Sequence, residues 1–152
     1  MQKLNFADAL DQILREDKRY HVDAYLFVKE ALDYTVKSMN KPVEGPEKHV
    51  TGTELLDGVR AYALREFGPL TLRVLHTWGI AGTEDFGEIV FNLVNKNVLG
   101  KSSNDSKSDF ANGYDFYEAF AVPFLPTAAV SAYRARSRGP HNKSAKTPMG
   151  NT

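Results

Sequence analysis

The sequence predicts a mainly α-helical single domain with a basic C-terminal tail. Two patterns indicate this fold class. Apolar residues recur with the 3.6-residue spacing of amphipathic helices over most of residues 5–97, and glycines and prolines stand where one helix ends and the next begins. The chain has 152 residues, 42% of them hydrophobic, and no cysteine. One hydrophobic core therefore forms without disulfides, and thiolate metal sites and cysteine nucleophiles are excluded.

Residues 1–40 predict a helical hairpin. Asn5 caps the first helix, the charged segment 16–21 interrupts the apolar period, and a second helix follows. The apolar stripes are Phe6, Ala9, Leu10, Ile13 and Leu14 in the first helix, and Ala24, Tyr25, Val28, Ala31, Leu32, Thr35, Val36 and Met39 in the second. Residues 41–50 contain prolines and a glycine, which predict a surface loop.

Three further helices are predicted, over residues 51–67, 69–78 and 83–97. The first begins with the capping-box spacing of Thr51 and Glu54. Gly68 and Gly79 end the first two of these helices. Thr83 is expected to cap the third, whose first turn carries the acidic residues favoured at the positive end of a helix dipole.

Beyond residue 97 the periodicity is weaker. Residues 101–108 are polar and typical of a mobile loop tip. Two arrangements remain open for residues 98–116: a tight turn of the primed type at Asn112 and Gly113, or one short β-hairpin around the polar loop. A short helix is expected through residues 118–120, ending at Pro123, with one further turn at residues 128–132.

The order of elements in residues 51–133 resembles that of a winged helix. A DNA-reading helix presents cations or amides near its start, where they reach phosphates and base edges. The helix at residues 83–97 instead presents Glu84, Asp85 and Glu88, whose charges repel phosphate. We therefore expect this winged-helix-like order to serve the packing of the helices rather than the reading of DNA.

The net charge of zero is divided unequally along the chain. Residues 134–152 contain only basic ionisable side chains besides one histidine, which leaves 14 basic and 19 acidic residues in residues 1–133. The basic side chains are Arg134, Arg136, Arg138, Lys143 and Lys146. With one large apolar residue after Tyr133, residues 134–152 are predicted to be a disordered tail. Such a tail binds an acidic protein surface or, weakly, nucleic acid, or serves solubility alone.

No motif specifies a reaction. The four histidines, His21, His49, His76 and His141, lie one to a region, and none has a second metal-ligand side chain at helical spacing. Glu84 and Glu88 stand one turn apart, as solvated carboxylates commonly do. P-loop, dinucleotide-binding and nucleophile-elbow patterns do not occur. We therefore assign no catalytic residue, no metal site and no cofactor.

A candidate partner or ligand surface combines aromatic and histidine side chains from several regions. It consists of Tyr20, His21, His49, Trp78, Phe116 and Phe120. Two glycines inside predicted helices, Gly58 and Gly87, each cost about 1 kcal/mol relative to alanine. They indicate close approach of another helix, of the aromatic segment 116–124, or of a partner.

Three segments of the chain resemble one bacterial protein family. They are Arg19-Tyr20-His21 with Asp23-Ala24-Tyr25, His49-Val50-Thr51-Gly52 with Glu54-Leu55-Leu56-Asp57-Gly58, and Trp78-Gly79-Ile80 with the run from Thr83 to Val94. The family has no known function and is largely restricted to planctomycetes and verrucomicrobia. The resemblance spans residues 4–126 and implies a bacterial, cytoplasmic origin, but no activity, cofactor or site residue.

Three functions follow as hypotheses. The first is a non-enzymatic protein-binding module, adaptor or regulator, whose partner is an unknown protein. The second is a nucleic-acid-binding regulator that uses the winged-helix-like half and the basic tail. The third is an enzyme or metal protein of unknown reaction, built around His21, His76 or Glu84 with Glu88. Because the sequence lacks an apolar leader and any run of about 18 apolar residues, we expect a cytoplasmic protein without a membrane partner.

Overall fold

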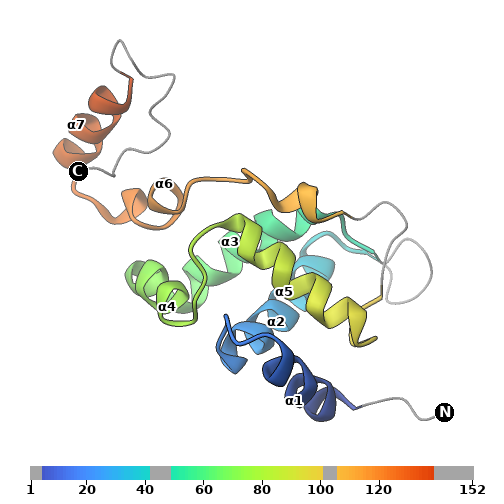
Figure 1. Ribbon diagram of the computed structural model, residues 1–152. Helices are drawn as coiled ribbons and strands as arrows, with labels where there is room; N and C mark the ends of the chain where they lie inside the picture. Colours follow the sequence, from blue (N-terminus) through green and yellow to red (C-terminus); the bar gives the residue numbers. More distant parts are fainter. Residues whose placement is uncertain (1–4, 42–48, 101–105, 139–152) are drawn as a thin grey trace.

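The computed structural model describes residues 5–41, 49–100 and 106–138, and over these ranges the chain is helical (Figure 1). The α-helices are α1 (Phe6–Glu16), α2 (Val22–Ser38), α3 (Gly52–Phe67), α4 (Thr71–Thr77), α5 (Thr83–Asn95), α6 (Phe116–Phe120) and α7 (Thr127–Ser137). Short 3-10 helices are η2 (Gly68–Leu70), η3 (Lys107–Phe110) and η4 (Val122–Phe124). The predicted mainly α-helical fold class is confirmed. No helix in these ranges has both the length and the apolarity that a bilayer crossing requires.

The helix ends follow the predicted local signals in most places. The Asn5 side chain accepts a hydrogen bond from the Asp8 amide at 2.8 Å, and Thr51 and Glu54 form the capping box that opens α3. The start of α5 differs from the prediction, because Gly82 occupies the cap position. The Thr83 hydroxyl instead donates to the Phe110 carbonyl at 2.6 Å, so it fastens η3 to α5 rather than capping the helix.

The core is arranged around α2, which packs against α1, α3 and α5 (Figure 1). Tyr25 and Val28 of α2, Val59 of α3 and Phe86 of α5 are fully buried in it. The predicted hairpin of α1 and α2 is present, and α1 also lies against α5. The amphipathic stripes of separate helices thus meet in one hydrophobic interior.

Helices α2 and α3 approach each other closely where Gly58 of α3 meets Thr35 of α2. A Cβ atom at position 58 would lie 2.8 Å from the Thr35 Cβ and would collide with its hydroxyl oxygen. The Thr35 hydroxyl donates to the Ala31 carbonyl of its own helix at 2.7 Å, so it requires no partner on α3. Gly87 has a similar role, because a Cβ atom at position 87 would lie only 3.0 Å from the Phe110 ring. Both helix glycines therefore serve internal packing.

Residues 98–116 do not form the β-hairpin considered above. The described residues of this segment, 98–100 and 106–116, contain no strand, so the wing of a winged helix is not formed there. Asn112 adopts a left-handed φ of 55°, but Gly113 does not, so the two residues do not form the type I′ turn, which requires a positive φ at both. The Gly113 amide donates to the Thr83 hydroxyl at 3.0 Å instead. Anchoring of η3 on α5 thus replaces strand pairing.

Helix α7 is longer than the single turn predicted, and it includes part of the predicted tail. Arg134 and Arg136 lie within it, so the tail boundary at residue 134 is wrong. Alanine and arginine are strong helix formers, and α7 is also held by tertiary contacts with α6. The rings of Tyr117 and Tyr133 lie 5.3 Å apart, and Arg134 pairs with Glu118 at 2.6 Å. Lys143 and Lys146 lie outside the described residues.

We predict that Gly58→Ala lowers the free energy of unfolding by about 1–2 kcal/mol. Overpacking costs about 1–3 kcal/mol, and the clash with the Thr35 Cβ places this substitution in the upper part of that range, about 2–3 kcal/mol. The gain in helix propensity returns about 1 kcal/mol. Urea unfolding followed by circular dichroism measures this difference. The matched control is Asp57→Ala, one residue earlier on the exposed face of α3, which should leave stability unchanged or slightly higher. Equal stability of the two variants would contradict the packing argument.

Candidate partner-binding surface

The structure does not bring the six predicted surface residues together. Tyr20, Phe116 and Phe120 are buried, with 3%, 6% and 1% of their surface exposed, so their assignment to a surface is wrong. The Tyr20 hydroxyl donates to Asp85 at 2.5 Å, and Phe116 and Phe120 pack edge to face with each other. Aromatic side chains bury a large apolar area, which favours their use in the core.

The other three residues lie at opposite ends of α3. The His21 amide donates to the Trp78 carbonyl at 3.1 Å, and Trp78 packs on Phe67 at the end of α3. His49 precedes the start of α3. The His21 ring accepts a hydrogen bond from the Asp23 amide at 3.0 Å and so caps α2. These contacts give His21 a structural role.

A polar network joins the link between α1 and α2 to α5. The Arg19 guanidinium donates two hydrogen bonds to Asp17, at 2.9 and 2.6 Å, and a third to Glu88 at 3.2 Å. Lys107 also donates to Glu88, at 3.1 Å, and Asn92 donates to Asp17 at 3.0 Å. Hydrogen bonds from these cations hold the pKa of Glu88 below its usual range.

The network leaves little room for the metal or acid–base site considered from the sequence. Glu88 is engaged by two cations, Asp85 accepts from the amides of Ala81 and Gly82, and Glu84 is exposed. His76 lies on α4, outside the network. Among residues 5–41, 49–100 and 106–138, no three histidine or acidic side chains cluster in a way that suits a metal ion. The network therefore acts as a fastening between chain segments.

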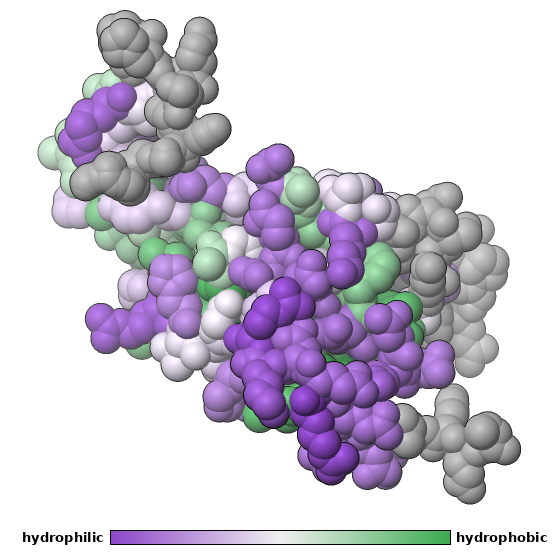
Figure 2. Space-filling model, viewed as in Figure 1, coloured by the Kyte–Doolittle hydropathy of each residue, from purple (hydrophilic) through white to green (hydrophobic). Residues whose placement is uncertain are grey.

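A shallow groove of about 600 Å³ runs between α4 and the segment from α6 to η4. We call it the α4–η4 groove. It is lined by Pro69, Leu72, Arg73, His76, Thr77, Phe120, Ala121, Phe124 and Leu125. Leu70 and Phe124 are exposed by 59% and 45%, the two highest values among the exposed large hydrophobic residues of the described chain. Figure 2 shows hydrophobic residues over α6 and η4, whereas the face of α1 and α5 is mostly hydrophilic.

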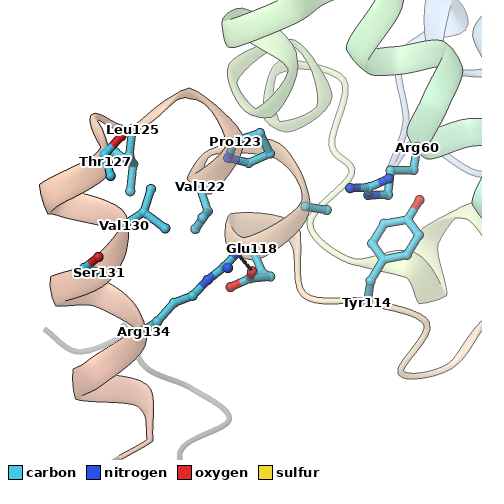
Figure 3. Close-up of a pocket in the computed structure, with 11 residues that line it drawn as sticks. Arg60, Tyr114, Glu118, Val122, Pro123, Leu125, Thr127, Val130, Ser131 and Arg134 are labelled. Atoms are coloured by element: carbon cyan, nitrogen blue, oxygen red, sulfur yellow. Dashed lines mark hydrogen bonds and ion pairs between the residues drawn. The ribbon is translucent and has the colours of Figure 1, made fainter.

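Within the described parts of the chain, the ionisable side chains that line this groove are Arg73 and His76, and none of its described lining residues is acidic. Leu125 also lines a second hollow of about 500 Å³, between α6, η4 and α7 (Figure 3). There Val122 and Val130 provide apolar walls, and Arg60 approaches from the body of the protein. Glu118 also lines the second hollow and is paired with Arg134, so the two hollows form an apolar surface bordered by Arg60, Arg73, His76 and this ion pair.

Sequence reasoning did not find this surface. The helix predicted over residues 69–78 includes Leu70 and Leu72 among its apolar residues, and Phe124 and Leu125 directly follow the short helix predicted to end at Pro123. The segment forms the short 3-10 helix η2, which ends at Leu70, and then the seven-residue helix α4. Leu75 of α4 is buried, whereas Leu70 of η2 is exposed. The run Val122-Pro123-Phe124-Leu125 in a turn too short for a full helix was the available signal. Which of its side chains face solvent depends on packing against α4 and α7.

Comparison of the chain with models of protein families, with curated proteins and with solved structures found no match. The family resemblance of residues 4–126, with its taxonomic restriction, stays a prediction. The function is therefore argued from the residues of this chain alone.

The pKa of the Asp17 carboxyl lies well below its usual range, mainly because of the hydrogen bonds from Arg19. A carboxyl whose pKa is lower in the folded chain stabilises the fold fully above its unfolded pKa of about 3.9, and this stabilisation is lost as the pH falls. We predict that the free energy of unfolding decreases below about pH 4, and that Asp17→Asn makes this decrease less steep. Denaturant unfolding from pH 7 to pH 2 measures both slopes.

At pH 7, Asp17→Asn should also lower the free energy of unfolding by about 1–2 kcal/mol, because a charge-assisted hydrogen bond to Arg19 is weakened. Asp11→Asn removes an exposed carboxylate from α1 and is the control for the loss of one negative charge. Identical slopes for Asp17→Asn and the unmodified chain between pH 4 and pH 2 would contradict this role of Asp17.

Proposed function

We propose that this chain is a non-enzymatic protein-binding module, and that the α4–η4 groove binds an acidic amphipathic segment of another protein. The observation that carries this proposal is an exposed apolar groove whose ionisable lining, in the described residues, consists of Arg73 and His76. Exposed apolar patches bordered by polar residues are typical of protein interfaces. A short amphipathic helix docks in such a groove through apolar anchors spaced one turn apart.

Charge complementarity supports an acidic partner. Arg73 and His76 line the groove, and Arg60 lies in the adjoining hollow. Arg136 and Arg138 continue the basic character along α7, whereas Arg134 is already paired with Glu118. Such charges steer an acidic segment and set its orientation, and the apolar anchors provide most of the affinity. A regulator or adaptor function is consistent with this mode of binding.

We predict that Phe124→Ser weakens partner binding by about 30-fold, the effect of losing a central apolar anchor worth about 2 kcal/mol. Photo-cross-linking from a benzoylphenylalanine at position 70 identifies the partner in a native lysate. Purified proteins then give the affinities. Leu26→Ser is the matched control, because Leu26 is an exposed apolar residue of α2 outside the groove.

Arg73→Glu tests the charge complementarity. This substitution should weaken partner binding by a larger factor at low salt than at high salt.

The same assays distinguish the competing hypotheses. A benzoylphenylalanine at position 26 is the cross-linking control. Equal cross-linking of the partner from positions 70 and 26 would contradict binding in the groove, as would an unchanged affinity of the Phe124→Ser variant for the partner. A gel shift with DNA or RNA at low salt that depends on Arg134, Arg136 and Arg138 would favour the nucleic-acid-binding regulator instead.

A further inference from the structure

A more enclosed cavity of about 490 Å³ lies between α2, α3 and α5, separate from the α4–η4 groove. This volume is within the range of about 300–1,000 Å³ that small-molecule sites occupy. Apolar side chains form the walls. Leu32 and Val36 come from α2, and Val90 and Val94 come from α5. The inner wall includes the buried side chains of Leu55 and Phe110.

The wall residues of α2 and α5 belong to the apolar stripes that predict burial, but they are only partly buried. Leu32, Val36, Val90 and Val94 each remain partly exposed. Residues on the same stripes that face other helices, such as Val28 and Ile89, are fully buried. The partial exposure therefore arises from the cavity between α2 and α5, and an apolar occupant would remove that surface from water.

The polar residues of the cavity are mainly basic. Among the described residues, Lys37, Lys41 and His49 line it, together with the carboxylate of Asp33. The Lys41 ammonium lies 3.5 Å from Glu54 Oε1, an oxygen that also accepts from the Thr51 amide at 2.9 Å. An ammonium has three donors, so Lys41 retains the capacity to bind a second anion. Asp33 lies 3.8 Å from Lys29, which partly balances its charge.

His49 lines the cavity together with Gly100, which follows α5 in the chain. A Cβ atom at Gly100 would lie 3.2 Å from the His49 Cε1, so the ring packs directly over the glycine. His49 and Lys41 thus both line this cavity. A ligand with one anionic end and an apolar body matches this division between basic and apolar walls.

We infer that this cavity binds a medium-chain monocarboxylic acid, with its hydrocarbon chain between α2 and α5 and its carboxylate at Lys41 and His49. The apolar walls bind the chain by removing it from water, and the ammonium of Lys41 binds the carboxylate by a charge-assisted hydrogen bond. An alcohol of the same length makes only the first interaction. An amine of the same length is repelled by the basic groups.

Isothermal titration calorimetry with decanoate, decanol and decylamine tests this inference, at concentrations below those at which each compound forms micelles. Decanoate should bind at one site and more tightly than decanol, and decylamine should bind most weakly. Lys41→Gln should weaken the binding of decanoate by about fivefold and leave the affinity for decanol unchanged. Lys18→Gln, which removes one positive charge outside the cavity, is the control and should change neither.

Val94→Phe fills the cavity and should abolish binding of both decanoate and decanol. Thermal unfolding of each variant without ligand shows whether the fold is retained, and Val36→Phe provides a second filling variant from the opposite wall. Absence of saturable heat with decanoate would overturn the inference. So would equal affinities for decanoate and decylamine, or undiminished binding to a folded Val94→Phe or Val36→Phe variant.

Discussion

The close contact between α2 and α3 at Gly58 is the constraint on which the rest of the structure depends. Helices normally pack with their axes about 8–10 Å apart, and the lower part of that range needs small residues at the crossing. Gly58 leaves space for Thr35, and the hydroxyl of that threonine is satisfied within its own helix. The cost of a glycine in a helix, about 1 kcal/mol, is offset by the apolar area that the two helices bury together.

The position of α2 in turn determines where α5 lies, and polar contacts hold α5 in place. The link before α2 carries Arg19 and Tyr20, which bind Glu88 and Asp85 of α5. Gly79, with a φ of 93°, packs its backbone against the Arg19 carbonyl, an arrangement that a side chain at this position would obstruct. Two of the three carboxylates at the start of α5 that argue against DNA reading, Asp85 and Glu88, thus have a structural use.

The two sites proposed for this chain have the same physical origin. Each lies where helices diverge and leave apolar side chains without a helix to cover them. At the α4–η4 groove the diverging elements are short, so the surface is open and suits a protein segment. Between α2 and α5 the elements are long, so the hollow is more enclosed and suits a small ligand. Both contain basic residues, although the chain as a whole is neutral.

Local signals allowed the helices to be predicted well. Asn5 and the pair Thr51 and Glu54 act through hydrogen bonds within three residues, so their caps do not depend on the rest of the fold. Thr83 was assigned wrongly for the opposite reason. Its hydroxyl is used by Phe110 and Gly113, which lie far along the chain, and no local pattern indicates such a partner.

The sequence by itself determined the helical class, most helix boundaries and the absence of a recognisable reaction motif, because periodicity, caps and helix-ending glycines act over a few residues. Only the tertiary structure decided which apolar residues are covered. Tyr20 and Phe120 are buried and Leu70 and Phe124 are exposed, a difference set by how helices of unequal length meet. Both candidate sites depend on that outcome, since a surface or cavity is a property of several segments together.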